Sequence, residues 1–151
     1  MPLRNETQSM FEMSRKIIQG ELPHPPVARL IGFRLVSIEP GTAVVELEAS
    51  EDHANPMGTL HGGILCDIAD AAMGLAYAAT LEAGESFATL ELKINYLRPF
   101  WTGDLTAVGK VLHAGRSVGV TECDVEDGAG RLVARATSTC MTLRGERARG
   151  R

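Results

Sequence analysis

Residues 61–74 read HGGILCDIADAAMG, and they open a long apolar stretch of this 151-residue chain. From Gly62 to about Thr80, apolar residues recur at spacings of three and four, which predicts one long helix. At about 1.5 Å per residue, this helix is roughly 30 Å long, the diameter of a small domain. Because apolar residues occupy nearly every side, we expect the helix to be buried all round.

Two aspartates near the middle of this stretch argue against its obvious alternative, a helix that spans a membrane. Asp67 and Asp70 would each cost about 2.5–3.5 kcal/mol at the centre of a membrane helix. We therefore expect the core helix of a water-soluble protein with no membrane partner, and its two carboxylates require a role.

The composition is that of an ordinary globular domain, with 44% apolar and 23% charged residues. A net charge of −4 without a basic stripe argues against a nucleic-acid partner. Three widely spaced cysteines (Cys66, Cys123 and Cys140) favour free thiols, and no secretory signal is visible, so we expect a cytoplasmic location. His53 and His113 lack the spacing of metal ligands, so no metal is assigned.

Strand patterns surround the helix. Segments with alternating apolar residues or turn-rich boundaries predict six strands, at 33–39, 42–49, 86–98, 105–113, 117–126 and 131–143. In the third segment, Leu90, Leu92, Ile94 and Tyr96 form the predicted apolar row. Two strands before a single helix and four strands after it predict an α+β fold with a mostly antiparallel sheet.

The chain divides into three predicted parts. Residues 1–26 form an N-terminal helical extension, with an amphipathic helix at 7–19 that ends at Gly20. Residues 27–143 form the main domain. Residues 144–151 are basic and lack apolar anchors, which predicts a flexible tail.

This order of elements, together with four local motifs, resembles the hotdog-fold acyl-CoA thioesterases. The similarity is to the PaaI-like branch of the 4-hydroxybenzoyl-CoA thioesterase superfamily and extends over about residues 27–143. The motifs are NPMGTLHGG at 55–63, the helix through Asp70 and Gly74, LELKINYLRP at 90–99, and the Gly115-Arg116 turn. The resemblance implies a long central helix wrapped by a curved sheet of about six strands.

The resemblance also implies a catalytic site. The backbone N–H of Gly62 points at the thioester carbonyl oxygen, and Asp70 activates a water molecule or attacks directly. Asn55 helps to hold the substrate carbonyl, His61 supports the glycine loop, and the hydroxyl of Thr89 helps to place the water. Strand alternation puts Thr89 opposite the apolar row, so a bulge or a dimer contact must turn it toward the site.

Four further residues are expected to bind the substrate. Gly63, like Gly62, lets it approach the backbone closely. Met73 and Tyr77, with the N-terminal segment, are expected to line the acyl pocket. Arg116 is assigned to a CoA phosphate by the resemblance, although a solvated turn residue explains it equally well.

The chemistry agrees with a helix N-terminus, which offers unpaired N–H groups and a partial positive charge to a developing oxyanion. One such donor is worth about 2.7–4 kcal/mol in a transition state. However, Gly62 and Asp70 are eight residues apart on one helix, a rise of about 12 Å. Both can act on one carbonyl only if they come from different subunits, so we expect an obligate homodimer. The resemblance adds that such dimers often pair into homotetramers.

Several alternatives stay open at this point. Asp70 could be a structural carboxylate, and Cys66 a buried apolar residue or a nucleophile without an activating histidine. The fold also serves acyl-thioester hydratases, which rely on a catalytic histidine absent from the body of this helix, and non-catalytic acyl-CoA-binding modules. The leading hypothesis is hydrolysis of aryl- or medium-chain acyl-CoA without a cofactor. The sequence does not separate CoA from acyl-carrier-protein thioesters, or water activation from an anhydride route.

Overall fold

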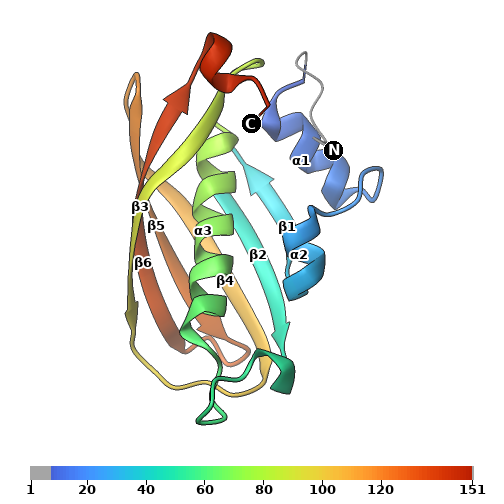
Figure 1. The fold of residues 1–151 in the computed structure, drawn as a ribbon, viewed down its shortest axis with the longest axis vertical. Coiled ribbons are helices and arrows are strands. Elements are labelled where there is room, and N and C mark those ends of the chain that lie inside the picture. Colours follow the sequence, from blue (N-terminus) through green and yellow to red (C-terminus); the bar gives the residue numbers. More distant parts are fainter. Residues whose placement is uncertain (1–7, 151) are drawn as a thin grey trace.

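The computed structural model describes residues 8–150 as six strands and three α-helices with two short 3-10 turns (Figure 1). In chain order the elements are α1 (Met10–Ile18), α2 (Pro26–Ile31), β1 (Arg34–Glu39), β2 (Thr42–Ala49), η1 (Glu51–His53), α3 (Gly62–Ala78), β3 (Ser86–Tyr96), β4 (Gly103–Ala114), β5 (Val118–Asp127), β6 (Leu132–Leu143) and η2 (Gly145–Ala148). The predicted α+β order of two strands, one long helix and four strands is confirmed.

All six strands form one antiparallel sheet in the order β1-β2-β4-β5-β6-β3. The sheet curves around α3, which contacts every one of its strands (Figure 1). Strand β3 follows α3 in the chain yet lies at the far edge, beside β6. One edge of the sheet is therefore β1, against which α1 packs, and the other is β3.

The helix α3 is buried on the side that faces the sheet. Ile68, Ala72 and Met73 are fully buried there. The backbone of α3 approaches β4 so closely that a Cβ on Gly109 would lie 2.3 Å from the carbonyl atoms of Ala72. The opposite side is open in the single chain, where Asp67 and Asp70 are both exposed. The prediction of burial all round is thus wrong for a single chain, because the sheet wraps only part of the helix.

A bulge in β3 changes which of its side chains face the helix. The register with β6 shifts between Thr89, which pairs with Cys140, and Glu91, which pairs with Thr139. Leu90 is the extra residue and is 55% exposed. A one-residue bulge inverts the alternation that follows it. Leu90 is therefore not part of the row of side chains that faces the helix. The bulge expected to turn Thr89 toward α3 is present.

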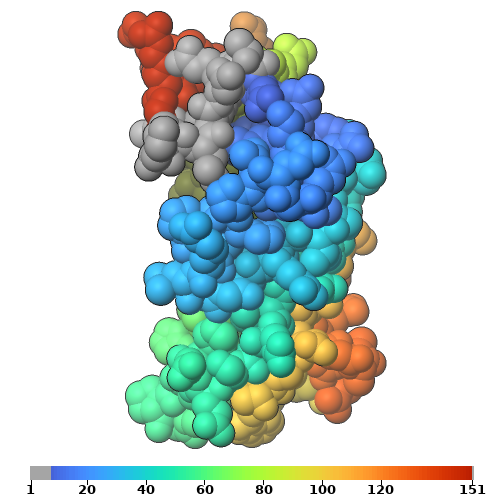
Figure 2. Space-filling model, turned by 90° about the vertical axis from the view of Figure 1, so that its right-hand side faces the viewer, coloured from blue at the N-terminus to red at the C-terminus, as the bar shows by residue number. Residues whose placement is uncertain are grey.

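The N-terminal helices cover one side of the molecule. In α1, Ser9 and Glu12 form a reciprocal capping box, and Ile17 is buried. Figure 2 shows these helices in blue above the green loop that precedes α3. Residues 1–7 and 151 lie outside the described part, and the three-part division of the chain stays a prediction. Among residues 8–150 no helix is both long and apolar enough to cross a membrane.

The segment after β6 is ordered for part of its length. Residues 145–148 form η2, in which Ala148 is buried, and Arg144 makes an ion pair of 2.6 Å with Glu85. The flexibility predicted for residues 144–151 stays a prediction.

Candidate active site

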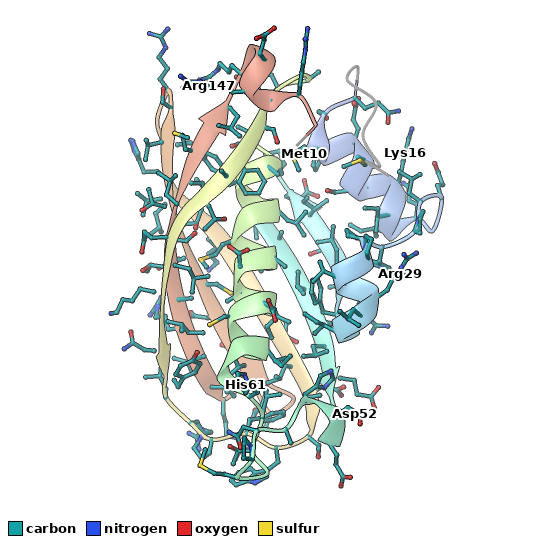
Figure 3. All side chains as sticks on the ribbon, in the orientation of Figure 1. Met10, Lys16, Arg29, Asp52, His61 and Arg147 are labelled. Atoms are coloured by element: carbon teal, nitrogen blue, oxygen red, sulfur yellow. The ribbon has the colours of Figure 1, made fainter. Side chains whose placement is uncertain are left out.

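The first turn of α3 leaves one backbone donor open. His61 is the N-cap, and its Nδ1 accepts a hydrogen bond of 2.9 Å from the Gly63 N–H. The Ile64 N–H donates to the His61 carbonyl. The hydrogen bond to Nδ1 assigns the proton of the neutral ring to Nε2. Among residues 8–150, the Gly62 N–H has no hydrogen-bond partner, so it is the free donor at this helix end. Figure 3 labels His61 at this end of α3.

Asn55 organises the loop that leads into α3. Its Oδ1 accepts from the N–H groups of Met57 and Thr59, and its Nδ2 donates to the Thr59 hydroxyl at 2.8 Å. Its own N–H donates to the Thr59 carbonyl. Three polar groups of one residue thus close this loop beside Gly62. One hydrogen of the side-chain amide is left for a ligand.

Asp70 lies two turns further along α3 and has its own partner. The Thr89 hydroxyl donates to Asp70 Oδ1 at 3.1 Å, a contact that the bulge at Leu90 makes possible. One turn closer to the N-terminus, partial burial and, to a lesser extent, the charge of Asp70 raise the pKa of Asp67. The two carboxylates therefore share the open side of the helix.

The predicted catalytic residues form two groups within one chain. Asn55 and Gly62 line one depression at the start of α3, next to the N-cap His61, whereas Thr89 donates to Asp70 near the middle of the helix. Eight residues of helix separate the two groups, a rise of about 12 Å.

A depression of about 370 Å³ opens beside Gly62. Its walls come from the loop before α3, the first turns of α3 and the segment after β3: Asn55, Thr59, Leu60, Gly62, Leu65, Tyr96, Leu97, Arg98, Pro99 and Phe100. The lining is mainly apolar, with polar groups near Gly62. Gly62, whose N–H is free, forms part of the wall.

Tyr96 is a site residue that the sequence analysis left in the apolar row. Its hydroxyl donates to the Gly62 carbonyl at 3.1 Å and lies 3.2 Å from Cys66 Sγ. The hydrogen bond with Cys66, followed by burial, raises the pKa of Tyr96 to about 12. The one signal in the sequence was its polar ring at the end of a row of aliphatic residues that face the helix.

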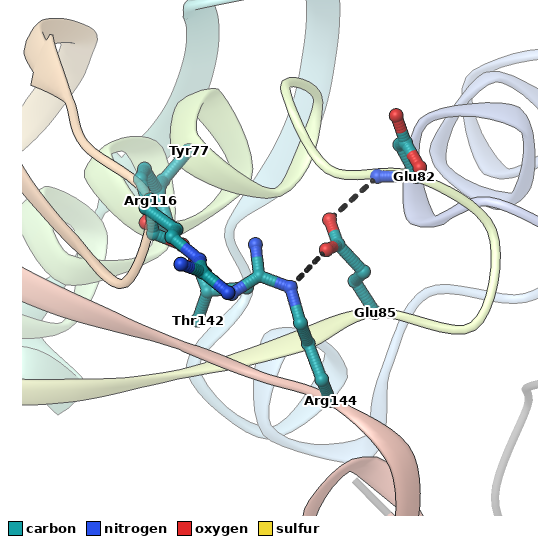
Figure 4. Close-up of polar contacts among 6 residues, drawn as sticks. All are labelled: Tyr77, Glu82, Glu85, Arg116, Thr142 and Arg144. Atoms are coloured by element: carbon teal, nitrogen blue, oxygen red, sulfur yellow. Dashed lines mark hydrogen bonds and ion pairs between the residues drawn. The ribbon is translucent and has the colours of Figure 1, made fainter.

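The other predicted substrate residues lie elsewhere. Met73 and Tyr77 are fully buried in the single chain, and the Tyr77 hydroxyl pairs with Thr142 at 2.7 Å. Arg116 lies on the exposed hairpin between β4 and β5, at the C-terminal end of α3. Its carbonyl accepts a hydrogen bond from Arg144 at 2.7 Å (Figure 4). Only Gly63, which is hydrogen-bonded to His61, adjoins the Gly62 group.

The histidines outside α3 do not gather with other ligand types. His53 Nδ1 accepts from the Ser50 N–H, and Nε2 lies 2.8 Å from the Ile31 carbonyl, so this ring joins α2 to the loop before α3. Within residues 8–150, no three His, Cys, Asp or Glu side chains cluster in a way that could hold a metal ion. The predicted lack of a metal and of a cofactor stays a prediction.

Comparisons with known proteins agree on one family. The family model described as "Thioesterase superfamily" matches residues 57–134. The 1,4-dihydroxy-2-naphthoyl-CoA hydrolase of Listeria monocytogenes is 36% identical over 68% of this chain and 84% of its own length. Human acyl-coenzyme A thioesterase 13 is 31% identical over 87% of this chain and 95% of its own. The structure of the E. coli PaaI protein from the phenylacetic acid degradation operon superimposes with a TM-score of 0.79 at 25% identity, over 91% of this chain and 98% of that one.

Proposed function

The chain belongs to the thioesterase superfamily as a PaaI-like hotdog thioester hydrolase, and from that premise we propose that it hydrolyses acyl-CoA with an aryl or medium-chain acyl group. The products are the free acid and CoA. The names of the two curated relatives, a naphthoyl-CoA hydrolase and an acyl-coenzyme A thioesterase, support a CoA ester as substrate. The same proposal includes a cytoplasmic location, where acyl-CoA is available as substrate.

The free N–H of Gly62 is the observation that carries the proposal. It lies at the positive end of α3 and beside the depression, where it would donate to the thioester oxygen as negative charge develops. Glycine at this position has no side chain, and the Tyr96 ring fills the space that a Cβ would take. The Asn55 amide stands beside it as a second donor to the same oxygen.

Asp70 supplies the base or the nucleophile. With Oδ1 bound to the Thr89 hydroxyl, Oδ2 remains to accept a proton from water, which then attacks the carbonyl carbon. In the alternative route Oδ2 attacks that carbon and CoA thiolate leaves. Water then hydrolyses the resulting mixed anhydride and regenerates the carboxylate. Thr89 orients the carboxylate in both routes.

The two groups act together across a homodimer, with Gly62 of one subunit facing Asp70 of the other. One support is the rise of about 12 Å that separates Gly62 from Asp70 within one chain. The other is that β3 lies at an edge of the sheet. Within residues 8–150 this strand pairs only with β6, the exposed side chain of Leu90 lies on it, and the exposed Leu97 follows its last residue. Pairing with a second copy would satisfy its unpaired backbone groups. Pairing of dimers into a tetramer belongs to the same proposal.

The first experiment measures thiol release from a panel of aryl- and fatty-acyl-CoA esters with the wild type and the Asp70→Asn variant. We expect kcat to fall at least about a hundredfold in Asp70→Asn, or around 2.7 kcal/mol. Asp67→Asn is the matched control, because it removes a carboxylate from the same open side of α3 without touching Thr89. It should retain kcat within about threefold of the wild type.

Two results would contradict the proposal. Equal turnover by the wild type and Asp70→Asn would exclude this carboxylate from the chemistry. Tight binding of acyl-CoA without turnover of any ester would favour a non-catalytic binding module.

A further inference from the structure

The side chain of Tyr96 spans the first turn of α3. Its hydroxyl donates to the Gly62 carbonyl and pairs with Cys66 Sγ, one turn further along. Its ring lies over Gly62, because a Cβ built on that glycine would be 2.8 Å from the ring carbon Cζ. Tyr96 thus touches the residue whose N–H is the proposed oxyanion donor, from a strand 34 residues away.

The contact belongs to a chain of hydrogen bonds. The Gly62 carbonyl and the Gly63 N–H are the two ends of one peptide group. Tyr96 donates to the carbonyl, and the N–H donates to His61 Nδ1 at 2.9 Å. A continuous series of hydrogen bonds therefore connects Cys66, Tyr96, this peptide and His61. Hydrogen bonds in such a chain polarise and strengthen one another.

These hydrogen bonds restrain the backbone at two successive glycines, where it is intrinsically most flexible. Two successive glycines have more accessible φ and ψ values than any other pair of residues. The peptide between Gly62 and Gly63 is held at both ends, which restrains the rotation at Gly62 that would reorient its own N–H.

The position of Tyr96 argues against a role in core stability alone. In the single chain the residue is 54% exposed, whereas α3 is anchored by fully buried residues such as Ile68, Ala72 and Met73. With a pKa of about 12, the hydroxyl stays protonated, and so able to donate, throughout the neutral range. Removal of the hydroxyl should therefore change the local geometry more than the stability of the fold.

We propose that Tyr96 is a positioning residue for the thioesterase reaction, a role that rests on the proposed function. Its hydroxyl holds the Gly62–Gly63 peptide so that the Gly62 N–H faces the thioester. Its action passes through Gly62 and requires no contact with the reacting atoms.

The test is Tyr96→Phe, which keeps the ring and removes both hydrogen bonds. We expect kcat to fall about five- to tenfold with KM within twofold, because the walls of the depression remain. The Gly63 amide, followed by NMR, should exchange with solvent several-fold faster. Thr139→Val is the matched control, since it removes a hydroxyl that donates to Glu91 on β3, away from α3. It should change neither kcat nor the exchange of Gly63.

A second variant separates the chain of hydrogen bonds from the tyrosine alone. Cys66→Ala should lower kcat about twofold in the wild type and have no further effect in Tyr96→Phe, because Cys66 acts through the phenol. Unchanged kcat and unchanged Gly63 exchange in Tyr96→Phe, beside an active wild type that depends on Asp70, would overturn the role of Tyr96 and leave the proposed function standing. A wild type without thioesterase activity would overturn both.

Discussion

A tyrosine lies at each end of α3, and the two side chains differ in burial and in hydrogen-bond partners. At the C-terminal end Tyr77 is 1% exposed, its hydroxyl is paired with Thr142, and its ring meets Phe87 edge-on at 5.9 Å between centroids. At the N-terminal end Tyr96 is half exposed, and its hydroxyl binds backbone and thiol. We call the C-terminal end the closed end, because side-chain packing covers it. We call the N-terminal end the open end, because it carries the free N–H of Gly62.

A glycine at each end makes room for its tyrosine. A Cβ on Gly119 would lie 2.1 Å from the ring of Tyr77, and a Cβ on Gly62 would lie 2.8 Å from that of Tyr96. The buried ring is held by its hydrogen bond to Thr142 and its contact with Phe87, whereas the ring of Tyr96 is half exposed in the single chain. We therefore expect the steric demand to act on stability at the closed end and, under the proposed function, on activity at the open end.

The sharpest test of the open end is chemical cross-linking, with an all-or-none result. If Gly62 of each subunit faces Asp70 of the other, the two-fold axis passes between the two copies of α3 at about the level of Cys66, midway between these residues. A bifunctional thiol reagent that spans about 8–10 Å, the distance between packed helices, should join the two subunits. Cys123 and Cys140 are buried, so Cys66→Ser should abolish the product. A dimer in sedimentation that resists this reagent would contradict the proposed pairing of the helices.

A matched pair of glycine variants tests the comparison directly. Gly119→Ala should lower the free energy of unfolding by about 1–3 kcal/mol, because the buried ring of Tyr77 must be displaced. Gly62→Ala should change stability by less than about 1 kcal/mol, since alanine favours a helix and the ring of Tyr96 can move. Its kcat should nevertheless fall about tenfold, because the methyl group and the displaced ring obstruct the approach to the N–H.

Urea unfolding and thiol release, measured on both variants, separate the two effects. The distinction between the ends fails if Gly62→Ala unfolds as readily as Gly119→Ala, or if its kcat equals that of the wild type.

Local signals explain how much of the fold could be predicted. The period of the residues after Gly62 and the turn residues between strands depend on neighbours in sequence, and they placed α3 and all six strands within a few residues. The glycines at the start of α3 also marked the open donor. These features need no knowledge of distant parts of the chain.

The rest of the site depends on contacts that a local pattern does not carry. The bulge at Leu90 arises in the pairing of β3 with β6, and it exchanges the faces of Thr89 and its neighbours. The hydrogen bond from Tyr96 to Gly62 joins the last residue of β3 to the first of α3. The exposure of Asp70 is a property of the single chain, whereas the helix composition is that of a buried element. The second copy that we propose on this side would reconcile the two.

The smallest expected effect concerns Arg116, at the closed end of α3. If its guanidinium binds a CoA phosphate, Arg116→Ala should raise KM for an acyl-CoA about threefold, as expected for an exposed ion pair. KM for the same acyl group on pantetheine, which lacks the nucleotide, should not change. The ratio of the two KM values isolates the nucleotide contact from any effect on the acyl pocket or on Gly62. Equal KM values for wild type and variant on the CoA ester would make Arg116 a solvated turn residue. The chemistry of α3 would then be confined to its open end and the open side of its middle turns.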